Sequence, residues 1–283
     1  MIKFGPSGNS TSFYVQGYSR SFETPKWLSS LGLNAYEYSF GRGVNLGEDT
    51  AMQIGSEAKK YDVEISVHAP YYINFANPSE EQILKSNAYV LDSLRLLKIM
   101  GGNRCVVHPG SLTKQTREEA FENVKRRMSD LVQIVKDSEY SDVLICPETM
   151  GRISYIGSVK EIVDICKIDK CLVPTFDFGH INSVTNGSLK TKDDYRKILD
   201  ILFDGLDEQR AKNIHIHFSK IEYGLKGEIR HLTFADTQYG PEFEPLAELL
   251  HEYKMTPFII SESDGTMAED ALKMKQIYES LKK

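Results

Sequence analysis

Histidine and carboxylate side chains follow short apolar runs at several places along this sequence. Residues 172–176 form such a run, which ends at Asp177, and His180 stands three residues further on. A mixture of imidazole nitrogen and carboxylate oxygen suits Zn, Mn or Fe, whereas an all-oxygen set would indicate Mg or Ca. Burying such groups together without a counter-charge would cost many kcal/mol, so they are either solvated or share metal ions, and zinc is the first choice. The same ending recurs at five more runs, which close with His68, His108, Glu148, the pair His215 and His217, and Glu262.

Parallel strands would bring these residues together, because the carboxyl ends of the strands in a closed parallel barrel meet on one face. Helices are expected over residues 25–31, 50–60, 158–167, 192–203, 241–253 and 267–281, and after capping sequences that begin at Ser79 and Thr116. This alternation predicts an α/β fold, a (β/α)8 TIM barrel, as a single domain over residues 1–283. A doubly wound open sheet is the alternative, but no GxGxxG or P-loop follows the first strand. The eight strand-like runs begin near Ile2, Asn34, Glu64, Arg104, Asp142, Leu172, Ile214 and Phe258.

The composition is that of an ordinary globular protein, with 41% hydrophobic and 26% charged residues. The apolar runs are too short to span a membrane and the start has no signal-peptide pattern, so a cytoplasmic protein with no membrane partner is expected. The formal charge of −6 gives no global basic footprint of a nucleic-acid binder. Bound divalent ions would change that balance locally, so the net charge does not exclude nucleic acid.

The motifs at the strand ends resemble those of the endonuclease IV family. The run from Val106 to Ser111 reads VVHPGS, and it is preceded by HAPYYIN from His68. The motifs PET, DFGH, HIHFSK and SE follow in the same order, and together they span most of the chain. The resemblance implies a (β/α)8 barrel that hydrolyses the phosphodiester on the 5′ side of abasic sites in double-stranded DNA, a DNA-repair endonuclease that uses three zinc ions, and a monomer is expected.

The same resemblance implies a set of ligands and roles. His68 and His108 would hold one ion and share Glu148 with a second, which Asp177, His215 and Glu262 would also hold. His180 and His231 would hold the third ion. The family has an Asp two residues before that last histidine, where this chain has Ile229. Glu228 offers a replacement through a loop adjustment; otherwise the third site is weakened, filled by water or absent, which would leave two ions.

The implied reaction uses a metal-bridged hydroxide as nucleophile, with Glu148 and Glu262 as catalytic residues and Glu262 as proton acceptor. Tyr71, which matches the family motif, and Arg42, in a loop that differs from the family, are the residues expected to contact DNA at the lesion.

Three points stay open from the residues alone. His215 and His217 share one face of a strand, and at least one of them is expected to support a ligand rather than act as one. His231 falls in the longer of two loops, 40–49 and 219–239, that should lie on the catalytic face. Related barrels include metal-dependent sugar isomerases and epimerases, which need one or two ions held mainly by carboxylates, and a barrel that binds metal or nucleic acid without turnover is a further alternative.

Overall fold

A closed barrel of eight parallel strands forms the centre of the computed structural model, which describes residues 1–281. The strands pair in two parallel sheets, β1-β12-β9-β8 and β2-β3-β4-β6. Parallel bridges join the two sheets on both sides, between Ser7 and Glu37 and between Glu148 and Thr175. The predicted (β/α)8 barrel is therefore confirmed. The strands are β1 (Lys3–Pro6), β2 (Ala35–Ser39), β3 (Glu64–His68), β4 (Arg104–Val107), β6 (Leu144–Pro147), β8 (Thr175–Asp177), β9 (His215–Phe218) and β12 (Phe258–Ser261).

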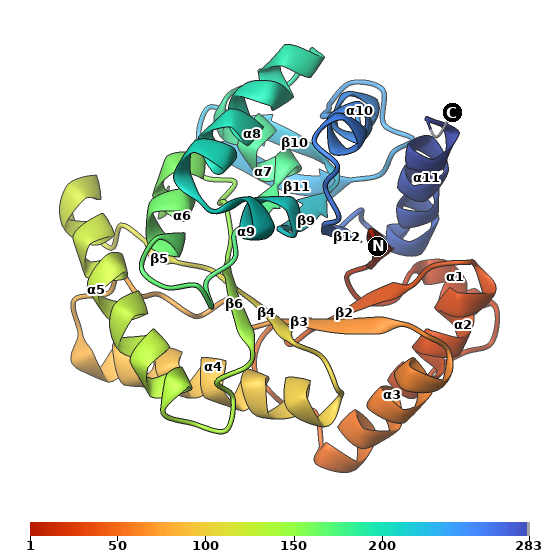
Figure 1. The fold of residues 1–283 in the computed structure, drawn as a ribbon, viewed down its shortest axis with the longest axis horizontal. Coiled ribbons are helices and arrows are strands. Elements are labelled where there is room, and N and C mark those ends of the chain that lie inside the picture. Colours follow the sequence, from red (N-terminus) through yellow and green to blue (C-terminus); the bar gives the residue numbers. More distant parts are fainter. Residues whose placement is uncertain (282–283) are drawn as a thin grey trace.

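Helices surround the strands (Figure 1), and α11, near the C-terminus, packs on β1, near the N-terminus. In α5, the Thr116 side chain accepts from the Glu119 backbone N–H, and the buried residues Ala120, Val124 and Met128 face the barrel. The Ser79 side chain makes no such bond at the start of α4. The outer helices are α2 (Thr24–Ser30), α3 (Glu48–Lys60), α4 (Glu80–Ile99), α5 (Arg117–Lys136), α6 (Val159–Cys166), α8 (Lys192–Gly205), α10 (Glu244–Glu252) and α11 (Met267–Ser280), and the short ones are α1 (Thr11–Val15), η1 (Ser21–Glu23), α7 (Phe178–Val184) and α9 (Glu208–Lys212).

The segment expected as a long loop over 219–239 contains an antiparallel hairpin, β10 (Lys220–Gly224) and β11 (Gly227–Leu232). Its register shifts at one point, because Glu222 pairs with Arg230 whereas the next residue, Tyr223, pairs with Glu228. Ile229 is therefore the extra residue of a β-bulge, which lets residues on either side of it change face. A second short pair, β5 (Gly110–Ser111) and β7 (Tyr155–Ile156), crosses the same end of the barrel.

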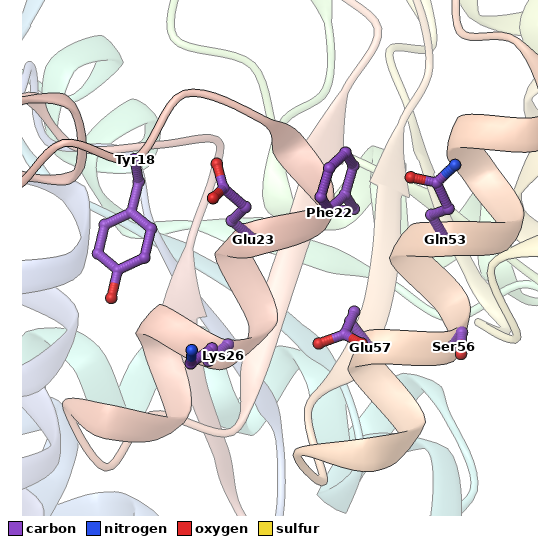
Figure 2. Close-up of a pocket in the computed structure, with 7 residues that line it drawn as sticks. All are labelled: Tyr18, Phe22, Glu23, Lys26, Gln53, Ser56 and Glu57. Atoms are coloured by element: carbon purple, nitrogen blue, oxygen red, sulfur yellow. The ribbon is translucent and has the colours of Figure 1, made fainter.

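One hollow lies on the outer side of the molecule, against α3, with a volume of about 410 Å³. Figure 2 shows side chains of η1 and α2 on one side of it and side chains of α3 on the other. None of the metal ligands predicted from the sequence lines it, so it is separate from that chemistry. The lining residues are Tyr18, Phe22, Glu23, Lys26, Gln53, Ser56 and Glu57. In residues 1–281, the helices include none that is long and apolar enough to cross a bilayer.

Candidate functional site

Histidine and carboxylate side chains gather at the carboxyl ends of the barrel strands and in the adjoining hairpin. Within residues 1–281, four groups place their ligand-type atoms within 4.8 Å of one another. Two of the groups share the carboxylate of Glu148, and two share His217. The groups are His68, His108 and Glu148; Glu148, Asp177, His217 and Glu262; His180, Glu228 and His231; and Glu37, His215 and His217.

The first group joins the ends of β3 and β4 to the residue after β6. The Nε2 atoms of His68 and His108 lie 3.2 and 3.1 Å from Glu148 Oε2. The other ring nitrogen of His68, Nδ1, lies 2.8 Å from the carbonyl oxygen of Ala69. Since a carbonyl can only accept, a proton on Nδ1 satisfies this contact, and the Nε2 lone pair would then be available to an ion held together with Glu148. This is the arrangement that ligating histidines usually have.

The second group contains His217 where the sequence analysis had placed His215. His217 Nδ1 lies 2.8 Å from Glu148 Oε1 and 3.5 Å from Glu262 Oε2. On the neighbouring strand, Asp177 is the register partner of His217. His215 is on the same face of β9 but two residues earlier, about 7 Å further from the carboxyl end of the strand. Because of that offset, the structure brings His217 and not His215 within 4.8 Å of the other three residues of this group.

The two catalytic carboxylates predicted from the sequence, Glu148 and Glu262, differ in their environment. Burial disfavours the charged form of Glu148, yet His217, His108 and His68 together hold its pKa well below the usual range. Burial raises the pKa of Glu262, and the like charges of Glu148 and Asp177 raise it further, although His217 opposes them. Glu148 is therefore the fixed anion of the group, and Glu262 is the carboxylate that takes up a proton most readily.

The third group lies between α7 and the β10–β11 hairpin. His180 Nε2 is 3.5 Å from Glu228 Oε2, and His231 Nε2 is 3.8 Å from Glu228 Oε1. The second nitrogen of each histidine is held elsewhere: His180 Nδ1 lies 2.9 Å from the Thr149 carbonyl oxygen, and His231 Nδ1 lies 2.8 Å from Ser219 Oγ. Both Nε2 atoms thus face one carboxylate.

The bulge explains how Glu228 reaches this group. On a regular strand, residues 229 and 231 would share a face, and Ile229 would stand beside His231. The extra residue instead turns Ile229 outward, where it is 54% exposed, and brings Glu228 to the face of His231. The sequence analysis found Ile229 at the position where the family has an Asp. In the structure the carboxylate beside His231 comes instead from the preceding residue, Glu228. His231 lies in β11 rather than in a loop.

Acidic neighbours also change the titration of His180. Burial lowers the pKa of the imidazole, but the negative charges of Asp177, Glu148 and Glu228 outweigh it and raise the pKa to about 9. The surroundings of this ring therefore favour a positive charge at its position.

The fourth group lies deeper in the barrel, and Glu37 in it was missed in the sequence. Burial disfavours ionisation of Glu37, but His217 and His215 hold its pKa well below the usual range. Burial lowers the pKa of His215 to about 4, so that ring is neutral. A carboxylate inside the apolar run that forms β2 could have indicated the residue, because an unpaired charge is rarely buried in a strand.

The donor sets fit divalent metal ions. Each of the first three groups combines imidazole nitrogen with carboxylate oxygen, the mixture preferred by Zn and by Mn or Fe. Asp177 Oδ2 is buried beside Glu148 and Glu262 without a hydrogen-bond partner, and the group that faces it is His180 Nδ1 at 3.4 Å. Because a buried carboxylate oxygen without a hydrogen bond is costly, a cation held with Glu148 and Glu262 would reduce the penalty.

The two residues expected to contact DNA lie on adjoining loops at this face. Tyr71 is 55% exposed, and its ring stacks on His108 with centroids 5.9 Å apart. Its backbone N–H donates to the Gly41 carbonyl at 3.1 Å, which places exposed Arg42 on the neighbouring loop. A cavity of about 450 Å³ opens beside Tyr71, and Glu262 and His231 line it.

Similarity to curated proteins extends along most of the chain. An uncharacterized protein of Methanocaldococcus jannaschii is 29% identical over 262 residues, which covers 92% of each chain. The probable endonuclease 4 of Thermotoga petrophila is 24% identical over 280 residues, 94% of each chain. The similarity to endonuclease IV proteins is thus found along most of the chain and not only in the motifs.

Solved structures with the same fold include both an endonuclease and an epimerase-like protein. Endonuclease IV from Thermus thermophilus superposes with a TM-score of 0.70 at 18% identity, covering 98% of each chain. A D-tagatose 3-epimerase-like protein gives a TM-score of 0.69 at 22% identity, covering 99% of this chain and 96% of the other. At these identities the superpositions establish the fold alone. The model of the xylose isomerase-like TIM barrel family matches residues 25–283, and the chain belongs to that family.

Proposed function

We propose that this protein is a metal-dependent phosphodiesterase that incises double-stranded DNA on the 5′ side of abasic sites. The observation that supports this most is the sharing of Glu148 between two ligand groups, with a third group of two histidines and a carboxylate beside them. His180 connects the groups, because its Nδ1 lies 3.6 Å from Glu148 Oε1. Three adjacent groups of this composition match the number of ions that the resemblance to endonuclease IV implies.

The residues that would hold the ions are those of the first three groups, and zinc is the proposed metal. Divalent ions held there would activate water as a nucleophile and offset the negative charge that develops on a phosphodiester. Glu148 stays anionic and would bind two ions at once. Glu262 has the raised pKa of a general base and stands at the wall of the cavity, where it can accept the proton of the attacking water.

The cavity beside Tyr71 and the loops around it could bind a DNA duplex that lacks one base. Tyr71 and Arg42 would fill the gap left by the missing base, and a deformation of this kind is cheaper where base stacking is already lost. Exposed cationic side chains stand on the loops and the hairpin around the site and would meet the phosphates of the backbone. They are Arg42, Arg152, Lys226 and Arg230.

The decisive experiment is cleavage of a duplex oligonucleotide that carries one abasic site, beside the same duplex without the lesion. The protein's metal content is measured first. Incision 5′ to the lesion that stops with a chelator and returns with zinc is the expected result. A protein that holds two or three ions and leaves the lesion intact would contradict the proposal.

A metal-dependent sugar epimerase is the second candidate, and one observation favours it. The group of Glu148, Asp177, His217 and Glu262 supplies three carboxylates and one imidazole, enough for a single ion of the kind such enzymes use. The likeness to a D-tagatose 3-epimerase-like structure is consistent with it. The two histidine-rich groups have no task in that chemistry. Epimerisation of a ketose by a protein that binds one ion per chain would favour this candidate.

A further inference from the structure

A buried carboxylate lies directly behind His217, on the side away from the barrel mouth. Glu37 Oε1 is 2.9 Å from His217 Nε2, a close ion-pair contact that is not aligned as a hydrogen bond, and both side chains are completely buried. The opposite nitrogen of the same ring, Nδ1, faces Glu148 and Glu262. His217 is thus enclosed between one carboxylate in the barrel interior and two at its mouth.

Three other histidines of the site share one arrangement, with which His217 can be compared. In His68 and His180 one nitrogen is held by a backbone carbonyl, and in His231 by a serine hydroxyl, while the other nitrogen faces the carboxylates. In His217 the nitrogens are exchanged, so that Nδ1 faces outward, and the group nearest the inner nitrogen is the carboxylate of Glu37. A carboxylate beside the inner nitrogen favours a proton there and makes the imidazole a more basic ligand.

The surroundings of Glu37 keep its carboxylate in place. Ser66 Oγ on β3 donates to Glu37 Oε2 at 2.9 Å, and His215 Nε2 lies 3.1 Å from the same oxygen. His215 is fixed in turn by stacking on Phe258, with ring centroids 5.1 Å apart. Strands β2, β3, β9 and β12 therefore all contribute to the position of one side chain.

We propose that Glu37 is a positioning residue: it holds the proton of His217 on Nε2 and so presents the Nδ1 lone pair to the ion shared by Glu148, Asp177 and Glu262. His215 belongs to this supporting network and is not itself a ligand. The inference rests on the metal centre of the proposed function, but not on the identity of the substrate.

Two substitutions separate this role from simple packing. Glu37→Gln keeps a neutral acceptor of the same length, whereas Glu37→Met keeps the volume and removes the acceptor. Zinc affinity is measured by titration of the metal-free protein against a competing chelator. Loss of a partner behind a ligand costs about 10–100-fold in metal affinity, so we expect about 10-fold for Gln and about 100-fold for Met, both confined to one ion. Ser66→Ala, which leaves the carboxylate intact, is the matched control and should lose less than either.

The tautomer of His217 provides a direct readout. In the zinc-loaded wild type, ¹⁵N NMR should show a protonated Nε2 and a ligated Nδ1, and Glu37→Met should lose that pattern while the signals of His68 and His180 remain. Unchanged zinc affinity and an unchanged His217 pattern in folded Glu37→Met would overturn the inference, as would equal weakening of every ion. If the Met variant fails to fold, the Gln variant and its His217 pattern decide.

These measurements require no DNA. A protein that binds zinc through His217 in this way but does not incise abasic duplexes would disprove the proposed function and leave the role of Glu37 standing. A wild type that places no ion at Glu148, Asp177 and Glu262 would disprove the positioning role.

Discussion

The two oxygens of Glu148 face different histidines. Oε2 lies 3.2 Å from His68 Nε2 and 3.1 Å from His108 Nε2, whereas Oε1 lies 2.8 Å from His217 Nδ1. Because each oxygen belongs to a separate group, the side chain cannot be altered for one group alone. Its almost complete burial leaves water no room to replace a lost oxygen.

Glu148→Gln should therefore remove two ions together. An amide offers one oxygen and no negative charge, so we expect metal content to fall by about two ions per chain and activity by more than about 100-fold. Metal analysis after dialysis and the abasic-site assay check both quantities. Glu248→Gln, on the outside of α10, is the control, because Glu248 forms a surface ion pair with Lys192 and lies outside the four ligand groups. Retention of both ions in Glu148→Gln would refute the shared role.

The role of Glu228 as the carboxylate of the third group can be tested by moving the carboxylate to position 229. Glu228→Gln should lower the affinity for the third ion by about 10-fold or more, since one of three ligands loses its charge. Ile229→Asp in that background should not restore it, because residue 229 points to solvent on the bulge. Full recovery by Ile229→Asp, measured as zinc stoichiometry, would show that the bulge does not hold in solution.

The β10–β11 hairpin is attached to the barrel by close backbone contacts near Gly227. Glu228 N–H donates to the Gly151 carbonyl at 2.7 Å, and Gly227 forms a bridge with Arg152. Gly227 has a φ of 97°, and a Cβ there would lie 2.1 Å from the Gly151 carbonyl oxygen. The hairpin can approach this loop only because residue 227 is a glycine, since both the positive φ and the lack of space exclude a side chain there.

Gly227→Ala should therefore displace the hairpin from the barrel. We expect a destabilisation of about 1–3 kcal/mol and loss of the third ion, with the first two retained. Denaturant unfolding and zinc stoichiometry measure the two effects. Gly224→Ala in the same hairpin is the control, because a Cβ there meets only the flexible end of Ile229 at 3.4 Å. Equal behaviour of the two variants would contradict the expected contact.

Much of this site follows from the positions at which apolar runs end. His68 and Asp177 end their strands and His108 follows its strand by one residue, as the sequence suggested, because parallel strands in a barrel must place such residues on one face. The sequence could not decide whether His215 or His217 lies beside Glu148 and Asp177, since both occupy the same face of β9. Only the register with β8, which pairs His217 with Asp177, decides their depth.

Two other features depend on contacts that no local pattern encodes. The bulge at Ile229 arises from pairing across the hairpin, so the sequence alone could offer Glu228 only as a possible replacement. Glu37 has partners on two other strands. Ser66 is its register partner on the adjacent strand β3, and His215 and His217 lie on β9, far away in the sequence. The sequence can therefore draw attention to Glu37 as a charge within a strand, but its partners become known only after the barrel is closed.

The whole barrel encloses an unusual density of ionisable groups at one end. Glu37, Glu148, Asp177, His215 and His217 are all at most 1% exposed, and the remaining ligand candidates surround them. Bringing these groups together without ions opposes folding, whereas an ion bound only by the folded chain stabilises it by mass action.

Chelation should therefore lower the melting temperature. One ion at 1,000 times its Kd stabilises the folded state by about 4 kcal/mol, so removal should shift Tm by roughly 10 °C or more. Differential scanning calorimetry with and without chelator, followed by readdition of zinc, gives the measurement. A Tm that does not respond to either treatment would show that the folded chain gains no stability from the metal.

The bulge at Ile229 also bears on how relatives of this chain are recognised. A pattern search that demands a carboxylate two positions before the last histidine would reject this sequence and score its third site as lost. The structure suggests a different criterion, in which an acidic residue three positions before the histidine is accepted when a bulge lies between them. Sequences rejected because the spacing of these two residues differs should be examined again for such a bulge. One inserted residue can keep the carboxylate beside the histidine although the sequence pattern is no longer matched.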